Sequence, residues 1–310
     1  MIESEINIRD DSALSQHIQL VTHLNQQEEL AVQHLIAKTL LKLANWFGAK
    51  GQPEQEMEQL RPLIARFQDS TVEGVQVLVA KAMDNLSFTY GTQGLPEQET
   101  EQRHTLIKRF EDSEFEGVQV VVAEAMFINF LYLDQPEQGA EQLCTLIKRF
   151  EDSEFEDVQV HVAQAMLSLA RTYEALGLPE QETKQLRTLI ERFQDSTVED
   201  VQIRVASAMF ILACTYGEVR ETEQLHTLIE RFEDSEFEGV QVVVAEAMNN
   251  LALTYHDQGQ TEREMEQYRC LIARFEDLQV QVDEIKDYVD HAKSKVSGPT
   301  KSWSKRLFGE

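Results

Sequence analysis

The chain has 310 residues, of which 55 are Asp or Glu and 28 are Lys or Arg, giving a formal net charge of −27. Its apolar content of 42% is enough for a packed core, and its 13 glycines and 6 prolines are too few for a loop-rich all-β protein. Because phosphate contacts need clustered Lys and Arg, direct nucleic-acid binding by the body of the chain is disfavoured. Two explanations of the acidity stay open, the solubility of an elongated surface and the attraction of a basic partner.

The N-terminal segment, residues 1–31, begins with the acidic and polar stretch MIESEINIRDDS, which is unlike a signal peptide. Within it, residues 20–31 keep the spacing of a helix that recurs later, with Leu20, Val21 and Leu24 at its apolar positions. We therefore expect a degenerate half-repeat there. No apolar run approaches the length of a membrane span, so we expect a cytoplasmic protein.

A 43-residue unit then recurs in about six copies between residues 32 and 277. The copies open at Val32, Val75, Val118, Val158, Val201 and Val240. The stretch RFEDSEFEGVQVVVAEAM occurs at 109–126 and again, unchanged, at 231–248. A period of this length is typical of a solenoid, in which each unit buries its apolar face against its neighbours.

The first half of each copy is predicted to be one helix of about twenty residues. In the second copy, Ser70 and Glu73 form an S-x-x-E pair, the pattern of a capping box that starts a helix. Gly94 ends the helix, and its apolar face consists of Val75, Val79, Met83, Leu86 and Tyr90. The run VQVVV also has strand-like alternation, but no turn residue separates it from the helical positions that follow, so we predict a helix.

The second half of each copy is predicted to be another helix, beginning at a proline whose missing amide costs nothing in the first turn. These prolines are Pro53, Pro96, Pro136 and Pro179, and the apolar positions of the first such helix are Leu60, Leu63, Ile64 and Phe67. The third copy lacks three residues around 133–134, and the fifth lacks the Gly-Leu-Pro-Glu turn near Val219. We expect these shorter turns to alter the local superhelix pitch.

The pattern changes after Asp277. In residues 278–296, Leu278, Val282, Ile285 and Val289 form a heptad-like apolar stripe, which predicts a capping helix or, alternatively, a dimer seam. The tail, residues 297–310, is predicted to be flexible and is basic and aromatic. Two interpretations of the tail stay open: a disordered end, or a docking motif for a partner groove, an acidic surface or anionic lipid, carried by Trp303, Lys305, Arg306, Leu307 and Phe308.

The spacing Leu86, Tyr90, Gly94, followed by Pro96 and a helix ending in Arg-Phe-x-Asp-Ser, resembles the tetratricopeptide repeat, in particular its longer bacterial variants. The resemblance covers roughly residues 20–277 and implies an all-α solenoid of antiparallel helix hairpins forming a superhelix. It departs from the family at the start of the second helix, where Glu56, Glu99 or Glu182 replaces a small Ala, and in its 43-residue period. Members of the family are typically non-enzymatic adaptors that bind peptides or helices in a concave groove lined by the first helices.

Comparison of the copies within this chain separates scaffold from surface. The core positions barely change from copy to copy, whereas three positions of the first helix vary, and we call each set of equivalent positions a row. Lys81, Asp84 and Phe88 represent the three rows and lie on one helical face. By the resemblance, that face lines the groove. The predicted partner-binding residues are Lys81, Asp84, Phe88, Phe127, Leu131, Leu167, Arg171, Phe210, Asn249 and Leu253, and the apolar ones among them are expected to be exposed anchors.

The sequence contains no G-x-G-x-x-G, G-x-x-x-x-G-K-[ST] or H-E-x-x-H motif, so we expect no enzyme, cofactor or metal site. Its cysteines, Cys144, Cys214 and Cys270, occupy different repeat positions, and we expect free, buried or half-buried thiols. The leading hypothesis is a protein-binding scaffold that holds a peptide or amphipathic helix. The alternative is an acidic inhibitor, similar to an immunity protein or antitoxin, that covers a basic toxin or nuclease. The oligomeric state stays open.

Overall fold

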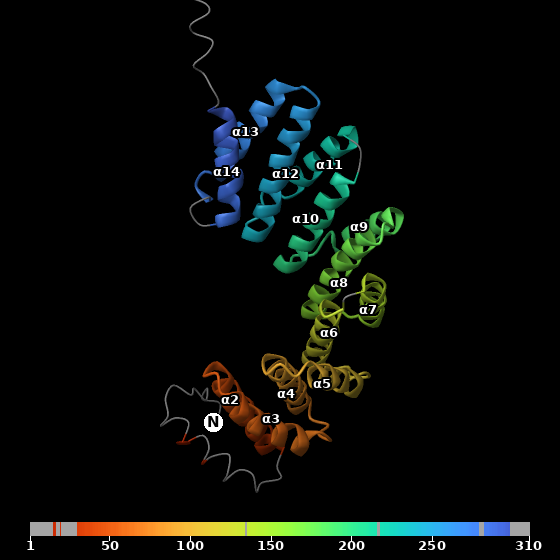
Figure 1. The fold of residues 1–310 in the computed structure, drawn as a ribbon, viewed down its shortest axis with the longest axis vertical. Helices are drawn as coiled ribbons and strands as arrows, with labels where there is room; N and C mark the ends of the chain where they lie inside the picture. Colours follow the sequence, from red (N-terminus) through yellow and green to blue (C-terminus); the bar gives the residue numbers. More distant parts are fainter. Residues whose placement is uncertain are drawn as a thin grey trace, which may run out of the picture. The chain divides into compact units, whose positions relative to one another are not determined.

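The computed structural model describes residues 15, 16, 19, 30–133, 135–215, 218–278 and 282–297. Its helices are drawn in Figure 1. They follow one another along the chain, and no strand lies between them in these residues. They are α2 (Leu30–Ala49), α3 (Pro53–Phe67), α4 (Glu73–Thr92), α5 (Pro96–Arg109), α6 (Glu116–Leu131), α7 (Pro136–Arg149), α8 (Glu156–Ala175), α9 (Pro179–Phe193), α10 (Glu199–Cys214), α11 (Glu218–Arg231), α12 (Glu238–Asp257), α13 (Thr261–Phe275) and α14 (Asp283–Val296). The predicted all-α solenoid of helix hairpins is confirmed, and the strand alternative is wrong for the described residues.

The chain divides into two compact units, residues 1–162 and 163–310, with the boundary inside α8. In unit 1 each first helix packs against its own second helix and against the next first helix, as α4 does with α5 and α6. The fully buried side chains at these contacts include Leu60, Val75, Leu106 and Val118. Unit 2 repeats the arrangement from α9 to α13. Each hairpin therefore buries its apolar face against neighbouring hairpins, as the repeat predicts.

The predicted capping boxes do not form. In the second copy the helix N-cap is Val72, and Ser70 lies two residues earlier, where its Oγ accepts from the Val72 amide at 3.3 Å. Glu73 is consequently the first helical residue, too early to reach back as a capping-box glutamate. Another side chain holds the turn instead, because Gln76 Nε2 donates to the Ser70 carbonyl oxygen at 3.0 Å. The same bond recurs as Gln119–Ser113, Gln159–Ser153, Gln202–Ser196 and Gln241–Ser235.

The predicted helix ends are confirmed. Gly94 has a φ of 70°, a left-handed conformation that favours glycine, and the next amide, Leu95 N, donates to Tyr90 O at 3.0 Å. Pro53, Pro96, Pro136 and Pro179 each open a second helix. The shortened copies lose a helical turn, since α6 and α10 have 16 residues whereas α4 and α12 have 20. The pitch change expected there stays a prediction.

An arginine near the end of a second helix joins consecutive hairpins. Arg149 Nη2 donates to the carbonyl oxygens of Phe110 at 2.9 Å and Glu111 at 2.6 Å, just beyond the end of α5. Its guanidinium also lies 5.2 Å from the ring centre of Phe150. Arg274 makes equivalent bonds to Phe232 O and Glu233 O. These bonds satisfy carbonyl groups that a helix C-terminus leaves without intrahelical partners.

Helix α14 closes unit 2 by packing against α12 and α13. Ile285, Val289 and Ala292 are fully buried in that contact, so this part of the apolar stripe is covered within the chain and is not an open dimer seam. The half-repeat expected at residues 20–31 lies outside the described residues except at its last two positions, and the tail motif lies wholly outside them.

The three cysteines form no disulfide, as expected, but all are exposed rather than buried or half-buried. Cys144 directly follows the buried Leu143, and a rotation of about 100° per residue turns it to the opposite side of α7. None of the described helices is both long enough and apolar enough to cross a membrane.

Candidate protein-binding site

The three variable rows of the first helices differ in exposure. The row containing Phe88 is exposed in five copies, at Asn45, Phe88, Leu131, Arg171 and Cys214, and half-buried at Leu253. The row containing Lys81 is exposed or half-buried in every copy, at Lys38, Lys81, Glu124, Gln164, Ser207 and Glu246. The row containing Asp84 is buried or half-buried throughout, at Leu41, Asp84, Phe127, Leu167, Phe210 and Asn249.

The exposure expected for Phe127 and Leu167 is therefore wrong. Their exposed fractions are 8% and 6%, that of Asn249 is 7%, and Phe210 is half-buried. At 3.6 residues per turn, this row lies to one side of the other two, about 60° around the helix from the row containing Lys81 and about 40° from the row containing Phe88. The ring of Phe127 accordingly packs inside unit 1, with its centre 5.6 Å from that of Phe130.

Large apolar side chains remain exposed on α4 and α6 of unit 1. Phe88 is 68% exposed and Leu131 is 62% exposed, in equivalent positions of two helices that pack side by side. Tyr132, at the end of α6, is 66% exposed and was not among the residues predicted from the sequence. We call the surface formed by Asp84, Phe88, Glu124, Leu131 and Tyr132 the α4–α6 face.

A buried ion pair lies behind this face. Arg103 on α5 is 4% exposed, and its Nη2 lies 2.5 Å from Oε1 of Glu99, which is 5% exposed. Arg103 Nη1 donates to Asn129 Oδ1 on α6 at 3.3 Å, and the guanidinium lies 5.2 Å from the ring centre of Tyr132. The equivalent positions in other copies hold buried leucines, such as Leu60 and Leu143. An arginine at a leucine position was the sequence signal for this cluster.

Asp84 is the only charged residue in its row, and it is half-buried. Burial, together with the negative charge of Glu124 on α6, raises the pKa of its carboxyl group to about 6 against the opposing charge of Arg103. A substantial fraction of Asp84 is therefore protonated near pH 6, although most carboxyl groups ionise near pH 4.

The predicted residues of unit 2 lie in a more polar setting. Arg171 is exposed, and its positive charge lowers the pKa of Glu246 against a larger rise caused by burial. Burial raises the pKa of Tyr288 on α14, and the negative charge of Glu246 adds to the rise. Helix α14 packs against α12, the helix that carries Glu246, Asn249 and Leu253. Leu253 is half-buried. Unit 2 thus offers no exposed apolar pair equivalent to Phe88 and Leu131 among these residues.

The glutamates that replace the family's small residue are partly internal. Glu99, Glu182 and Glu264 are each about 5% exposed or less. Glycine on the preceding helix makes room for Glu99, since a Cβ on Gly91 would lie 2.6 Å from Glu99 Oε2. In the sixth copy a histidine takes the glycine position, and His256 Nδ1 lies 3.0 Å from Glu264 Oε2. These glutamates close the hairpin ends and do not form a ligand pocket.

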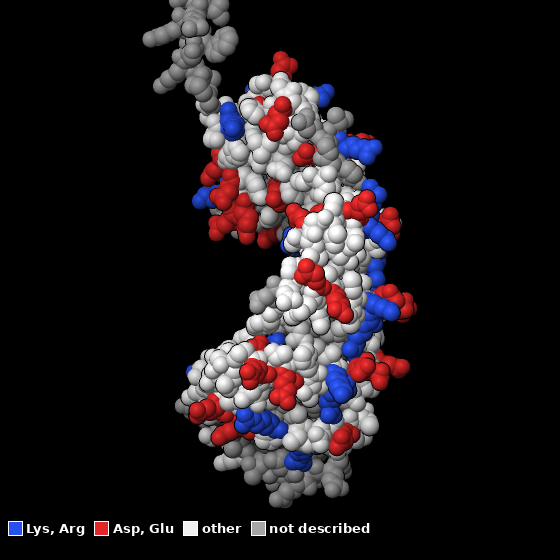
Figure 2. Space-filling model, turned by 45° about the vertical axis from the view of Figure 1, so that its right-hand side comes forward, with Lys and Arg blue, Asp and Glu red and all other residues white. Residues whose placement is uncertain are grey.

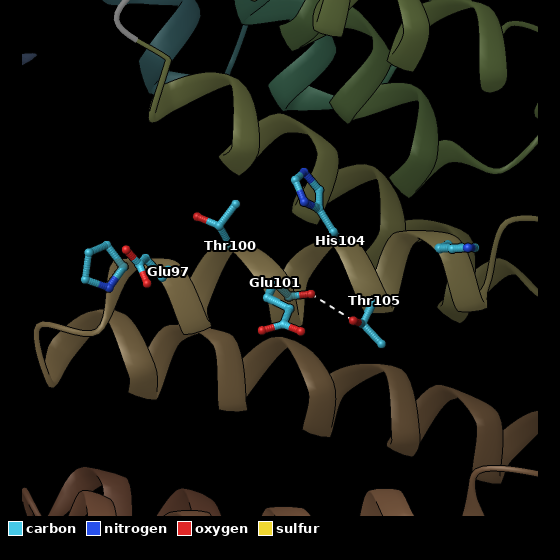
Figure 3. Close-up of a pocket in the computed structure, with 7 residues that line it drawn as sticks. Glu97, Thr100, Glu101, His104 and Thr105 are labelled. Atoms are coloured by element: carbon cyan, nitrogen blue, oxygen red, sulfur yellow. Dashed lines mark hydrogen bonds between the residues drawn. The ribbon is translucent and has the colours of Figure 1, made fainter.

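An open hollow of about 660 Å³ lies over one side of α5 (Figure 3). Its labelled residues, among them Thr100 and His104, all come from that helix, and Thr105 Oγ1 donates to Glu101 O at 2.8 Å. Without a second wall the hollow has no convergent groups for catalysis. Within the described ranges no group of three His, Cys, Asp or Glu side chains is placed to hold a metal ion.

Charge is distributed rather than gathered on the surface drawn in Figure 2, where Asp and Glu side chains form several separate groups with uncharged surface between them. Part of the acidity also has an internal role. Burial lowers the pKa of Arg149 and of Arg274, and the negative charges of Glu111 and Asp112, and of Glu233 and Asp234, partly oppose that lowering. The acidic turns therefore help hold the arginines that join the hairpins.

The tetratricopeptide repeat model matches residues 244–276, which contain most of α12 and all of α13. No curated protein matches the sequence. Among solved structures, the chain is similar to the signal transduction ATPase with a tetratricopeptide repeat sensor from Pyrococcus horikoshii, with a TM-score of 0.51 and 8% identity over 91% of this chain and 43% of the other.

Two further structures give lower TM-scores. The apo form of RapI gives a TM-score of 0.46 and 13% identity, covering 92% of each chain. The kinesin light chain repeats from Podosopora anserina give a TM-score of 0.37 and 15% identity, covering 84% of this chain and 97% of the other. The family model thus matches one helix hairpin of the chain, and the described helices repeat that hairpin arrangement along it.

Proposed function

We propose that this protein is a non-enzymatic scaffold that holds a segment of another protein on the α4–α6 face. The exposure of Phe88, Leu131 and Tyr132 carries the proposal, since these side chains are 62–68% exposed while most other large apolar side chains are buried or half-buried. Aromatic and aliphatic side chains of this kind are the usual anchors of protein interfaces. A solenoid supplies the extended, rigid surface on which such anchors can be arranged.

Affinity capture from cell lysate tests the proposal with matched variants. The double variant Phe88→Ser/Leu131→Ser removes apolar anchors from exposed positions, where substitutions usually change stability by less than about 0.5 kcal/mol. The control Thr100→Ala/His104→Ala changes exposed residues of α5 instead. We expect a protein captured by the wild type and the control to be lost from the double variant. Undiminished capture by the double variant would contradict the proposal.

Salt separates this function from acidic inhibition. Binding through apolar anchors should persist as ionic strength rises, whereas capture of a basic toxin by the acidic turns should weaken steeply. The position of Arg149 and Arg274 beside the acidic turns favours the scaffold, because the charges of Glu111, Asp112, Glu233 and Asp234 already act on a cation of the chain itself. Collapse of capture between low and moderate salt would instead support the inhibitor.

The tail is proposed as a separate docking motif, with Trp303, Lys305, Arg306, Leu307 and Phe308 as its contacts. A deletion that tests it should start after Ser297, because His291 and Ala292 belong to α14 and Ala292 is fully buried. We expect removal of 298–310 to leave helicity unchanged and to lose only those captured components, protein or anionic lipid, that depend on the tail.

A further inference from the structure

We propose that the segment held on the α4–α6 face presents a Lys or Arg side chain flanked by apolar residues, with its cation placed against Asp84 and Glu124. This inference rests on the proposed function and names the chemistry of the partner at the same face. It follows from two properties of the face, a carboxylate pair without a full complement of cations and the apolar side chains beside it.

The acidic component comes from two neighbouring helices. Asp84 on α4 is half-buried, Glu124 on α6 is exposed, and the negative charge of Glu124 adds to the effect of burial in disfavouring ionisation of Asp84. A partially desolvated carboxylate beside a second carboxylate is electrostatically unfavourable when both are ionised. A cation from a partner would relieve that repulsion, while an acidic partner would increase it.

No Lys or Arg among the described residues forms an ion pair with Asp84 or Glu124. Arg103 lowers the pKa of Asp84, but its guanidinium is shared among Glu99, Asn129 and Tyr132. Lys81, one turn before Asp84 on α4, is exposed and forms no ion pair with any described residue. Asp84 and Glu124 therefore leave the face open to another positive charge.

The apolar component lies beside the carboxylates, toward the C-terminal ends of α4 and α6. Phe88 lies one helical turn after Asp84, and Leu131 and Tyr132 end the helix that carries Glu124. The contact of Tyr132 with Arg103 joins this end of α6 to the same cluster. A partner Lys or Arg has a long apolar stem and a charged end. Its stem and its apolar neighbours would contact Phe88 and Leu131, while its cation reached Asp84.

Selection from a phage-displayed library of random 16-residue peptides against the full chain tests this chemistry. The selected peptides are then measured by fluorescence anisotropy with the wild type, Asp84→Asn, Glu124→Gln, the Phe88→Ser/Leu131→Ser double variant and the control Glu97→Gln. Glu97 is exposed on α5, and Asp84→Asn keeps the shape of the side chain while removing its charge. Circular dichroism of each variant establishes that the helices are retained.

We expect the peptides that depend on Phe88 and Leu131 to contain Lys or Arg next to apolar residues. Asp84→Asn should weaken them about tenfold, as expected for loss of a partly buried charge pair. Replacing the peptide cation by Gln should weaken binding to the wild type but hardly affect binding to Asp84→Asn. The control Glu97→Gln should bind like the wild type.

Two results would overturn the inference in different ways. The inference would be contradicted if the peptides that depend on Phe88 and Leu131 lacked a cation, or if they bound Asp84→Asn as well as the wild type. Either result would leave the proposed function standing. A selection that enriches no peptide dependent on Phe88 and Leu131 would contradict both.

Discussion

Arg103 and Glu99 form an ion pair one helical turn apart on α5, with 2.5 Å between Nη2 and Oε1, in a position where neighbouring repeats place a leucine. The side chains of Arg103 and Glu99 are 4% and 7% exposed. A buried pair of this kind contributes little compared with apolar side chains of similar volume, but removal of one member leaves an uncompensated charge. The pair therefore makes the second repeat sensitive to single substitutions.

Substitution of Arg103 should show this coupling. We expect Arg103→Leu to lower the free energy of unfolding by about 3–5 kcal/mol, because it leaves Glu99 buried without its cation. The double variant Glu99→Ala/Arg103→Leu, which approaches the Gly139 and Leu143 of the third repeat, should be much closer to the wild type. Urea unfolding of the single and double variants measures the difference, and additive losses would be the contrary result.

The bonds from Arg149 to the carbonyls of Phe110 and Glu111 should stabilise the junction between the second and third hairpins. We expect Arg149→Ala to cost about 1.5–3 kcal/mol, the range for charge-assisted hydrogen bonds. Lys148→Ala, at the adjacent exposed position, should change little. Urea midpoints of the two variants make the comparison, and equal midpoints would rule out this role of Arg149.

Asp84 should destabilise the fold near neutral pH. Its folded-state pKa of about 6 exceeds the unfolded value, so between these values the folded state binds more protons and stability falls as pH rises. We therefore expect Asp84→Asn to increase the urea midpoint at pH 7.5 more than at pH 4.5, where the carboxyl of the folded wild type is largely protonated. The same increase at both values would show that the substitution acts through something other than this charge.

Phe127 and Phe88 should separate stability from binding. Phe127 is 8% exposed, so Phe127→Ala should cost about 3–5 kcal/mol by opening a cavity. Phe88 is 68% exposed, so Phe88→Ala should leave the unfolding midpoint nearly unchanged while reducing partner capture. Paired thermal unfolding and capture measurements check both statements, and unimpaired stability of Phe127→Ala would contradict the packing described for α6.

The sequence predicts the hairpins well because each turn contains residues with one clear conformational preference. Gly94 takes the left-handed conformation expected of a helix-ending glycine, and Pro96 opens the next helix. The capping boxes failed because the N-cap is Val72 and the helix begins at Glu73, a shift of two residues that the S-x-x-E pattern cannot reveal. The surrounding backbone, fixed by Gln76, decides that boundary.

The candidate face was predicted less completely. Whether a side chain is exposed depends on its angular position around the helix, and rows that differ by less than the 100° between successive residues can differ in exposure. Phe88 and Phe127 both belong to variable rows, yet only Phe88 is exposed, although the two rows differ by only about 40° around the helix. The approach of Asp84 to Glu124 depends on the stagger between α4 and α6, which tertiary packing determines. The Arg103–Glu99 pair, by contrast, was accessible from its four-residue spacing.

Site-specific photocrosslinking tests the central claim most directly. A photoreactive phenylalanine analogue is placed either at position 88, on the α4–α6 face, or at position 104, on the exposed side of α5, and each protein is irradiated in cell lysate. We predict a crosslinked protein adduct from position 88 that Leu131→Ser diminishes, and none from position 104. An adduct from position 104 with none from position 88 would place the partner elsewhere and contradict the account.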